Sequence, residues 1–163
     1  MTRTTVASRE CRIYRLYRRM RGLWQAGVPW LPNLIRKYIR FVYACDLPYS
    51  AELGRNVSFP HNGLGVVIHA GVRIGDNCQI YQNVTIGGNG RAFPAGAEGP
   101  AVPTIGDGVI IYAGAVVAGP IHIGDGAVIS ANSLVLISVK ANAVVGGVPA
   151  RPLPIQAALY QRI

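Results

Sequence analysis

Aliphatic side chains recur at every sixth position along two stretches of this chain. A helix places apolar residues three and four apart, and an ordinary strand alternates them every second residue. A strict period of six fits neither pattern, but it fits a short strand, a tight corner and another short strand, repeated. Three such hexapeptides predict one triangular coil of a parallel β-helix, with each aliphatic residue pointing into the prism. The repeated positions are Ile68, Ile74, Ile80, Ile86, Ile105, Ile111, Val117, Ile123, Ile129 and Val135.

Small residues at fixed places in the hexapeptide support the same fold. Glycine follows the aliphatic residue at Gly75, Gly87, Gly106 and Gly124. We expect these glycines where a corner requires positive φ or a close approach of backbones. A Gly-rich β-sandwich would vary its strand spacing more, so the β-helix is the favoured fold.

Two interruptions break the period. The in-phase residue after Phe59 is Ile68, nine positions on, so three extra residues lie near His61 to Val67. The segment 87–104 is rich in Gly, Ala and Pro, and we expect it to leave the prism as an extruded loop. A loop of this length in a compact domain is usually functional or disordered.

These patterns divide the chain into three parts. Residues 1–45 form a basic N-terminal helical segment, 46–153 the β-helix domain with the extruded loop, and 154–163 a C-terminal tail. Within the first part, two helices are expected at 11–27 and 32–44, because the prolines of GVPWLP interrupt a helix.

The positive charge is concentrated in residues 1–45, which hold ten Arg or Lys and one acidic residue. The rest of the chain holds six basic and six acidic residues. Aromatic residues interleave with the arginines, a composition typical of helices at an anionic membrane surface. The same composition suits helices that pack on neighbouring subunits with solvated basic backs, and both interpretations stay open. Nucleic-acid binding has no accompanying motif and is not expected.

Composition also bears on location. No apolar stretch approaches the roughly 20 residues of a transmembrane helix, and the N-terminus lacks the apolar core of a signal peptide. Cys11, Cys45 and Cys78 have neither zinc-site nor disulfide spacing. We therefore expect a reduced cytoplasmic protein, peripheral at the inner membrane surface if the basic segment binds lipid.

His61, at the first break in the repeat, is the candidate general base, because imidazole accepts a proton near neutral pH. Asp46 precedes the first coil and is the candidate carboxylate that orients the His61 ring. Its alternative role is that of a turn residue. His69 lies near the same break and is a candidate substrate contact. No second ligand stands at metal spacing, so no metal site is expected.

Several motifs resemble one enzyme family. The runs IYQNVTIGGNGR, PTIGDGVIIYAGAVV, IHIGDGAVISANSLVL and GGVPARPL resemble the left-handed β-helix acyltransferases, and more narrowly the serine acetyltransferases and their relatives in capsule and exopolysaccharide clusters. The resemblance implies a homotrimer that binds acetyl-CoA between two prisms, with His61 and Asp46 as catalytic residues. It further implies acetyl-CoA contacts at Gly87, Gly88, Arg91, Ala113, Gly114, Ala131 and Arg151.

Two departures concern the acceptor. Serine acetyltransferases carry Asp just before the catalytic His and an Asp-Arg-His-Pro segment before the second repeat run; this chain has Pro60, and then Pro100, Ala101, Val102 and Pro103. Without those charges, the site would lose charge-assisted hydrogen bonds to free serine, each worth roughly 1.5–3 kcal/mol. The acceptor pocket is expected around His69 and Val102.

The sequence thus predicts an acetyl-CoA-dependent O-acetyltransferase acting on a hydroxyl of a sugar, carried on a lipid or glycan intermediate in surface polysaccharide biosynthesis. Serine O-acetylation in cysteine biosynthesis is the first alternative. A non-catalytic β-helix scaffold is the second.

Overall fold

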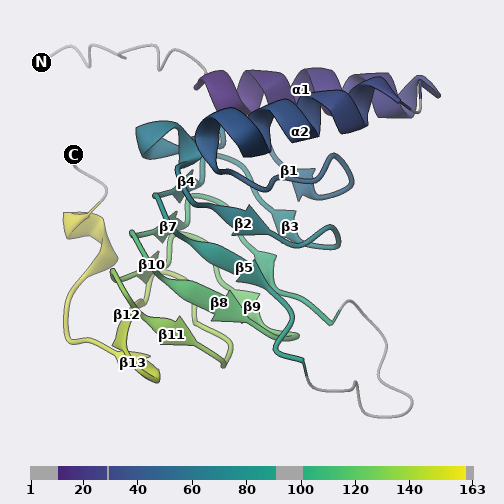
Figure 1. The fold of residues 1–163 in the computed structure, drawn as a ribbon. Helices are drawn as coiled ribbons and strands as arrows, with labels where there is room; N and C mark the ends of the chain where they lie inside the picture. Colours follow the sequence, from purple (N-terminus) through teal and green to yellow (C-terminus); the bar gives the residue numbers. More distant parts are fainter. Residues whose placement is uncertain (1–10, 29, 91–100, 161–163) are drawn as a thin grey trace, which may run out of the picture.

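The computed structural model describes residues 11–28, 30–90 and 101–160. Two antiparallel helices lie across one end of a triangular prism, and the C-terminal segment lies at the side of the prism (Figure 1). Among the described residues, no helix is long and apolar enough to cross a membrane.

Two helices form the N-terminal part, α1 (Arg12–Gln25) and α2 (Leu31–Tyr43), and each starts and stops within two residues of its expected range. The thiol of Cys11 accepts a hydrogen bond from the Tyr14 amide at the start of α1. Pro32 lies in the first turn of α2, where its missing N–H leaves no intrahelical bond unmade. Ala44 ends α2 in the left-handed conformation.

Three parallel sheets form the walls of the prism. The first contains β1 (Glu52–Leu53), β3 (Arg73–Ile74), β6 (Thr104–Ile105) and β9 (His122–Ile123). The second contains β4 (Gln79–Ile80), β7 (Ile110–Ile111), β10 (Val128–Ile129), β12 (Val144–Gly147) and the antiparallel β13 (Ala150–Pro152). The third contains β2 (Val67–Ile68), β5 (Thr85–Gly87), β8 (Val116–Ala118) and β11 (Leu134–Val135). Two short 3₁₀ turns complete the elements, η1 (Pro60–Gly63) and η2 (Ala157–Leu159).

The core confirms the period of six. All ten repeated aliphatic residues are buried, and the small residues four positions on, such as Val84 and Ser133, are buried beside them. This arrangement is the left-handed parallel β-helix expected from the sequence.

Strand register confirms the two interruptions. In the regular part Ile110 pairs with Val128, eighteen residues on, which is one coil of three hexapeptides. Glu52 pairs instead with Arg73, three residues further than a regular coil would place its partner. The coil that contains residues 87–104 is longer still, because Gln79 pairs with Ile110, thirty-one residues on instead of eighteen. The strands on either side of each insertion still pair in parallel register, so the stacking of the coils is undisturbed.

Two backbone requirements apply at the corners, a positive φ and a close approach of successive coils, and glycines such as Gly108 and Gly126 meet the first. Positive φ occurs at asparagines such as Asn77, Asn83 and Asn132, whose short polar side chains tolerate this conformation. Gly75 and Gly106 have ordinary φ, and a Cβ on either would collide with the aspartate on the next coil. At these two positions, glycine is therefore required by the close stacking of coils.

Candidate active site

His61 lies in η1, where three extra residues interrupt the first coil. Its backbone is left-handed (φ 56°, ψ 31°), and so is that of Asn62. Such a conformation costs a non-glycine residue roughly 1–2 kcal/mol. Backbone strain of this kind concentrates at functional sites. The His61 side chain is exposed, so its imidazole is open to a substrate.

The η1 turn leads from the second sheet to the third, so it occupies one long edge of the prism. The next two coils bond to this corner in turn: the Asn83 amide donates to Leu64, and the Gly114 amide donates to Gln82. The Asn132 amide then donates to the carbonyl of Ala113. We call this row the His61 edge; it consists of 61–65, 82–83, 113–114 and 131–132. It contains three of the residues expected to contact acetyl-CoA, namely Ala113, Gly114 and Ala131.

A second edge, where the third sheet passes to the first, contains His69, Gly87, Gly88 and Val102. Gly71 lies between His69 and Val102: a Cβ at Gly71 would stand 3.7 Å from His69 Nδ1 and 3.5 Å from Val102 Cγ2. Gly87 adjoins the Cβ of His69, and Gly88 adjoins the carbonyl of Ala101. We call this group the His69 edge; it consists of 69–71, 87–88 and 101–102. A single chain therefore holds the expected site residues on two edges of the prism.

The ring of His69 has a defined hydrogen bond. Its Nδ1 accepts a hydrogen bond from the Gly71 amide at 3.1 Å, and the residue is exposed. Arg151, by contrast, lies far along the chain on β13, with its guanidinium bonded to the carbonyl of Ala150 at 3.0 Å. Arg91 lies outside the described residues.

Asp46 follows α2 and forms a parallel bridge with Val67, so it extends the third sheet beyond β2. Its carboxylate binds two arginines of α2: Arg36 Nη2 lies 2.8 Å from Oδ1, and Arg40 Nη1 lies 3.5 Å from Oδ2. Neither arginine was expected from the sequence, although their spacing of four on one helix is the signal that aligns two cations on one face. Among the described residues, no hydrogen bond joins Asp46 to His61. Cys45 does reach the η1 turn, with its sulfur 3.4 Å from the Cβ position of Gly63.

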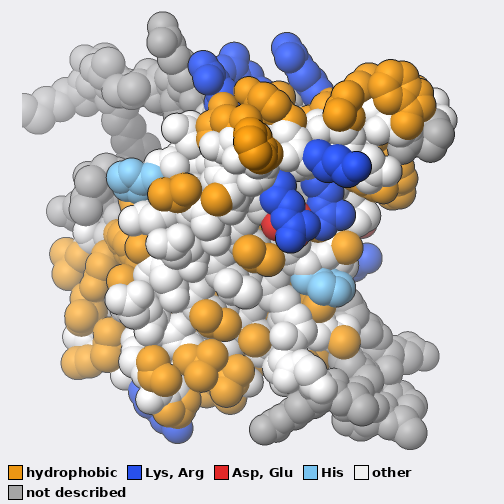
Figure 2. Space-filling view, viewed as in Figure 1, with side chains coloured by type: hydrophobic (Ala, Val, Ile, Leu, Met, Phe, Trp, Pro, Cys, Tyr) orange, Lys and Arg blue, Asp and Glu red, His pale blue; other side chains and the backbone are white. Residues whose placement is uncertain are grey.

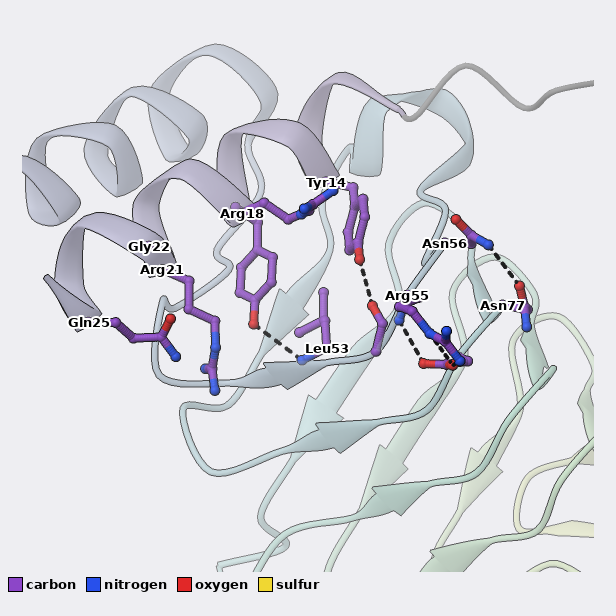
Figure 3. Close-up of a pocket in the computed structure, with 12 residues that line it drawn as sticks. Tyr14, Arg18, Arg21, Gly22, Gln25, Leu53, Arg55, Asn56 and Asn77 are labelled. Carbon is purple, nitrogen blue, oxygen red and sulfur yellow. Dashed lines mark hydrogen bonds and ion pairs between the residues drawn. The ribbon is translucent and has the colours of Figure 1, made fainter.

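A pocket of about 780 Å³ lies elsewhere, between α1 and the first two coils (Figure 3). Tyr14 and Tyr17 cross it: the Tyr14 hydroxyl donates to Gly54 at 2.7 Å, and the Tyr17 hydroxyl accepts from the Leu53 amide at 3.2 Å. Arg21 donates to the carbonyl of Ala51 at 2.8 Å. These bonds attach α1 to the open end of the prism, which a repeat fold must cap. None of the site residues expected from the sequence lines this pocket.

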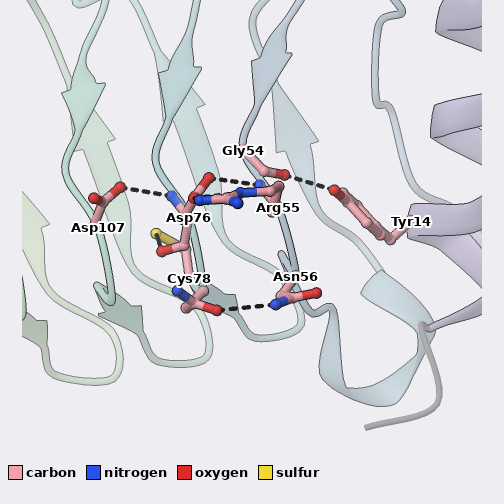
Figure 4. A network of polar contacts seen from close by, with 8 residues as sticks. Tyr14, Gly54, Arg55, Asn56, Asp76, Cys78 and Asp107 are labelled. Carbon is pink, nitrogen blue, oxygen red and sulfur yellow. Dashed lines mark hydrogen bonds and ion pairs between the residues drawn. The ribbon is translucent and has the colours of Figure 1, made fainter. Parts of the chain in front are cut away.

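A polar ladder continues from this pocket across the coils (Figure 4). Asp76 accepts from the Arg55 amide at 2.7 Å, and Asp107 accepts from the Asp76 amide at 2.7 Å. The bonds from the Arg55 backbone and then from its side chain hold the pKa of Asp76 below its ordinary value. The ladder has a structural role, since it fixes one coil on the next. No group of three or more His, Cys, Asp or Glu in the described part of the chain is arranged to hold a metal ion.

The chain is similar to known transferases. Residues 103–136 match the bacterial transferase hexapeptide family (six repeats). A serine acetyltransferase of Staphylococcus xylosus is 44% identical over 119 residues, which are 73% of this chain and 52% of that protein. The structure of a serine acetyltransferase from Brucella abortus in complex with coenzyme A aligns with a TM-score of 0.77 and 32% identity, over 85% of this chain and 53% of that one. A soybean serine acetyltransferase complexed with serine aligns with a TM-score of 0.77 and 36% identity, over 86% and 56%.

These similarities correct the expected acceptor. The prediction of a sugar or glycan acceptor in polysaccharide biosynthesis is wrong, because the relatives at 36–44% identity are serine acetyltransferases. The missing charges near Pro60 and Val102 do not exclude serine as the acceptor. A lost charge-assisted bond of about 1.5–3 kcal/mol changes affinity by roughly one to two powers of ten, which does not identify the acceptor.

The chain spans about half the length of the curated relatives it matches. It is similar in sequence to the bacterial hexapeptide transferases and to about half of the serine acetyltransferase chain, and it folds as a left-handed parallel β-helix.

Proposed function

We propose that this chain transfers an acetyl group from acetyl-CoA to the hydroxyl of serine. The observation that carries the proposal is the 44% identity to a serine acetyltransferase, over a stretch long enough to include most of the coils. Similar structures of serine acetyltransferases contain coenzyme A in one case and serine in another, and these two molecules correspond to the donor and the acceptor of the proposed reaction.

The two edges of the prism support an active site between copies of the chain. His61 and Ala113 lie on one edge, whereas His69 and Gly87 lie on another. A groove between two prisms would unite one edge from each, and three prisms in a ring form three such grooves. We therefore propose a homotrimer.

The His61 edge suits the thin arm of acetyl-CoA. Ala113, Gly114 and Ala131 place little or no side chain at successive corners, so an extended chain can lie against the backbone. The adenine and phosphate end of that molecule is proposed to lie toward Arg151 and, from the resemblance, Arg91. The His69 edge, with Gly87, Gly88 and Val102, would form the opposite wall of the groove.

His61 is proposed to act as general base. Its imidazole accepts the proton of the serine hydroxyl as that oxygen forms a bond to the acetyl carbonyl carbon. The bond between this carbon and sulfur then breaks, and the imidazolium returns its proton to the leaving thiolate. The exposed position of His61 on a left-handed turn supports this role.

Asp46 is proposed to support His61, as the family resemblance implies. The contact of Cys45 with the η1 turn brings the two residues into adjacent segments. The carboxylate is held by Arg36, so an approach of the His61 ring to Oδ2 would compete only with the longer bond from Arg40.

Because acetyl-CoA is a cytoplasmic metabolite, we also propose a cytoplasmic location.

The test is formation of O-acetylserine from serine and acetyl-CoA, measured by mass spectrometry. We expect His61→Ala to lower kcat at least about a hundredfold, with little change in the KM for acetyl-CoA. His122→Ala is the matched control, because His122 is an exposed histidine on the regular strand β9. Serine-independent release of coenzyme A, or full activity of His61→Ala, would overturn the proposal; failure to bind coenzyme A would favour a scaffold.

Asp46 is tested in the same assay. Asp46→Asn should lower kcat by at least about tenfold, and the His61→Ala/Asp46→Asn double variant should be no slower than His61→Ala alone. Residues that act as one unit lose their effects together rather than additively. Additive losses would show that Asp46 acts independently of His61.

A further inference from the structure

The outer face of α2 exposes a continuous apolar stripe. Its residues are spaced by three and four along the helix, so they lie on one side, while Ile39 faces the core. Phe41 is 92% exposed and Trp30 is 66% exposed, values unusual for large apolar side chains. The stripe consists of Trp30, Leu34, Tyr38, Phe41 and Val42.

Basic residues are concentrated in the same helical part of the chain. Residues 11–45 contain eight Arg or Lys and no acidic residue. Lys37 lies on α2 at the margin of the stripe, and Arg15 and Arg19 are exposed on α1. Figure 2 shows apolar and basic side chains side by side over the helical end of the molecule. A partner that binds this face must therefore offer both an apolar region and negative charge.

A second copy of the chain does not offer such a partner within the described residues. Each described carboxylate is already bound: Asp46 to Arg36, and the others to an arginine or to a backbone amide of a neighbouring coil. Two copies meeting through α2 would bring eight positive charges against eight, with no acidic face to neutralise them. Self-association through this stripe is therefore disfavoured.

We propose that the outer face of α2 docks on an anionic lipid bilayer. The helix would lie in the plane of the surface, with Phe41 and Trp30 at the boundary between headgroups and acyl chains. Lys37 and the exposed arginines of α1 would contact the lipid phosphates. Nucleic acid fits less well, because the aliphatic members Leu34 and Val42 gain little against a sugar-phosphate backbone.

The inference does not depend on the proposed function, because the stripe contains none of the site residues. It would bring the chain to a membrane whatever reaction its prism catalyses. The two proposals can therefore fail separately, the first in a vesicle assay and the second in an acetylation assay.

The chain supplies its own reporter for this test. Both of its tryptophans, Trp24 and Trp30, lie in the helical part, and Trp24 packs on Tyr49 with ring centroids 5.5 Å apart. In a Trp24→Phe variant, Trp30 is the single tryptophan, and excitation at long wavelength avoids the tyrosines. Its emission should shift to shorter wavelength with vesicles of phosphatidylcholine and phosphatidylglycerol, and should not shift with phosphatidylcholine alone.

Co-sedimentation with the same vesicles measures affinity. We expect at least a tenfold loss for Leu34→Ser/Phe41→Ser and about a fivefold loss for Lys37→Gln, since each basic residue near the surface contributes a factor of that order. Ile137→Ser, which replaces an exposed apolar residue on a distant coil, is the control and should bind normally. Circular dichroism checks that each variant is folded.

Three results would overturn the proposal. One is equal sedimentation with both kinds of vesicle, or with neither. Another is concentration-dependent self-association in ultracentrifugation that Leu34→Ser/Phe41→Ser abolishes, which would assign the stripe to a second copy. The third is tighter binding to duplex DNA that the same double variant leaves unchanged, which would assign the face to nucleic acid.

Discussion

Arg36 of α2 binds Asp46 through two nitrogens, with Nε 3.0 Å and Nη2 2.8 Å from the same oxygen, Oδ1. The pair joins the middle of α2 to Asp46, the residue that opens the third sheet. Any movement of α2 would therefore shift the carboxylate of Asp46, which is proposed to support His61. The bond makes the helices part of the environment of the proposed site.

The strength of this pair can be measured by a double-mutant cycle with Arg36→Met and Asp46→Asn. Both side chains are partly exposed, at 35% and 20%, so solvent screens the charges and we expect a coupling of about 1 kcal/mol in urea unfolding. Arg73 and Glu52 form the comparison pair, because both are more exposed and should couple less. A coupling near zero for Arg36 and Asp46 would show that the pair does not hold α2 on the prism.

Pro60→Asp should improve serine binding. The new carboxylate would stand next to His61, where serine acetyltransferases carry an aspartate, and would meet the ammonium group of serine. A charge-assisted hydrogen bond is worth roughly 1.5–3 kcal/mol, so the KM for serine should fall at least about tenfold. Pro60→Asn supplies the same shape without the charge. Equal KM values for the two variants would show that the position does not face the acceptor.

Gly75→Ala should destabilise the prism. The added Cβ would collide with the Asp107 carboxylate and stand 2.7 Å from the carbonyl carbon of Gly106. Overpacking of this kind costs about 1–3 kcal/mol, measured by urea unfolding. Gly22→Ala in α1 has no atom within 4 Å of its Cβ and should stabilise the chain by about 0.5–1 kcal/mol. A loss of stability in both variants would point to a cause other than coil stacking.

We expect the buried thiols to lower the free energy of unfolding of the chain in alkali. Burial raises the pKa of Cys45 to about 12 and that of Cys78 to about 11. In the unfolded chain these thiols ionise near pH 8.5, so above that pH the unfolded state releases protons that the folded state retains. Their contribution is complete below about pH 8.5 and is lost as the pH rises toward 11–12.

Unfolding in urea at pH 7.5 and pH 10 measures this effect. The wild-type chain should lose more stability between the two values than Cys45→Ala/Cys78→Ala, which lacks both thiols. A thiol reagent at pH 8 provides the check, because half-buried Cys11 should react in the native chain and all three cysteines in urea. An equal loss in the double variant would assign the alkaline sensitivity to other groups.

The local sequence determined the fold because the β-helix is built from a local repeat. A period of six and the interruption before Ile68 are properties of consecutive residues, and the register of Glu52 with Arg73 follows directly from them. His61 could be chosen as candidate base for the same reason, since it marks a break in that repeat. The expectation of a sugar acceptor was wrong because a few residues near Pro60 indicate less about the acceptor than the similarity of the whole run of coils does.

Only the tertiary structure decided which side chains meet. Asp46 binds Arg36 because α2 folds back over the first coil, and no periodicity encodes that approach. His61 and His69, eight residues apart in the chain, lie on different edges because β2, a strand of the third sheet, runs between them. The apolar stripe on α2 faces outward because α1 and the prism already cover its opposite side. Such relationships depend on how elements pack, and packing joins residues that sequence spacing leaves unrelated.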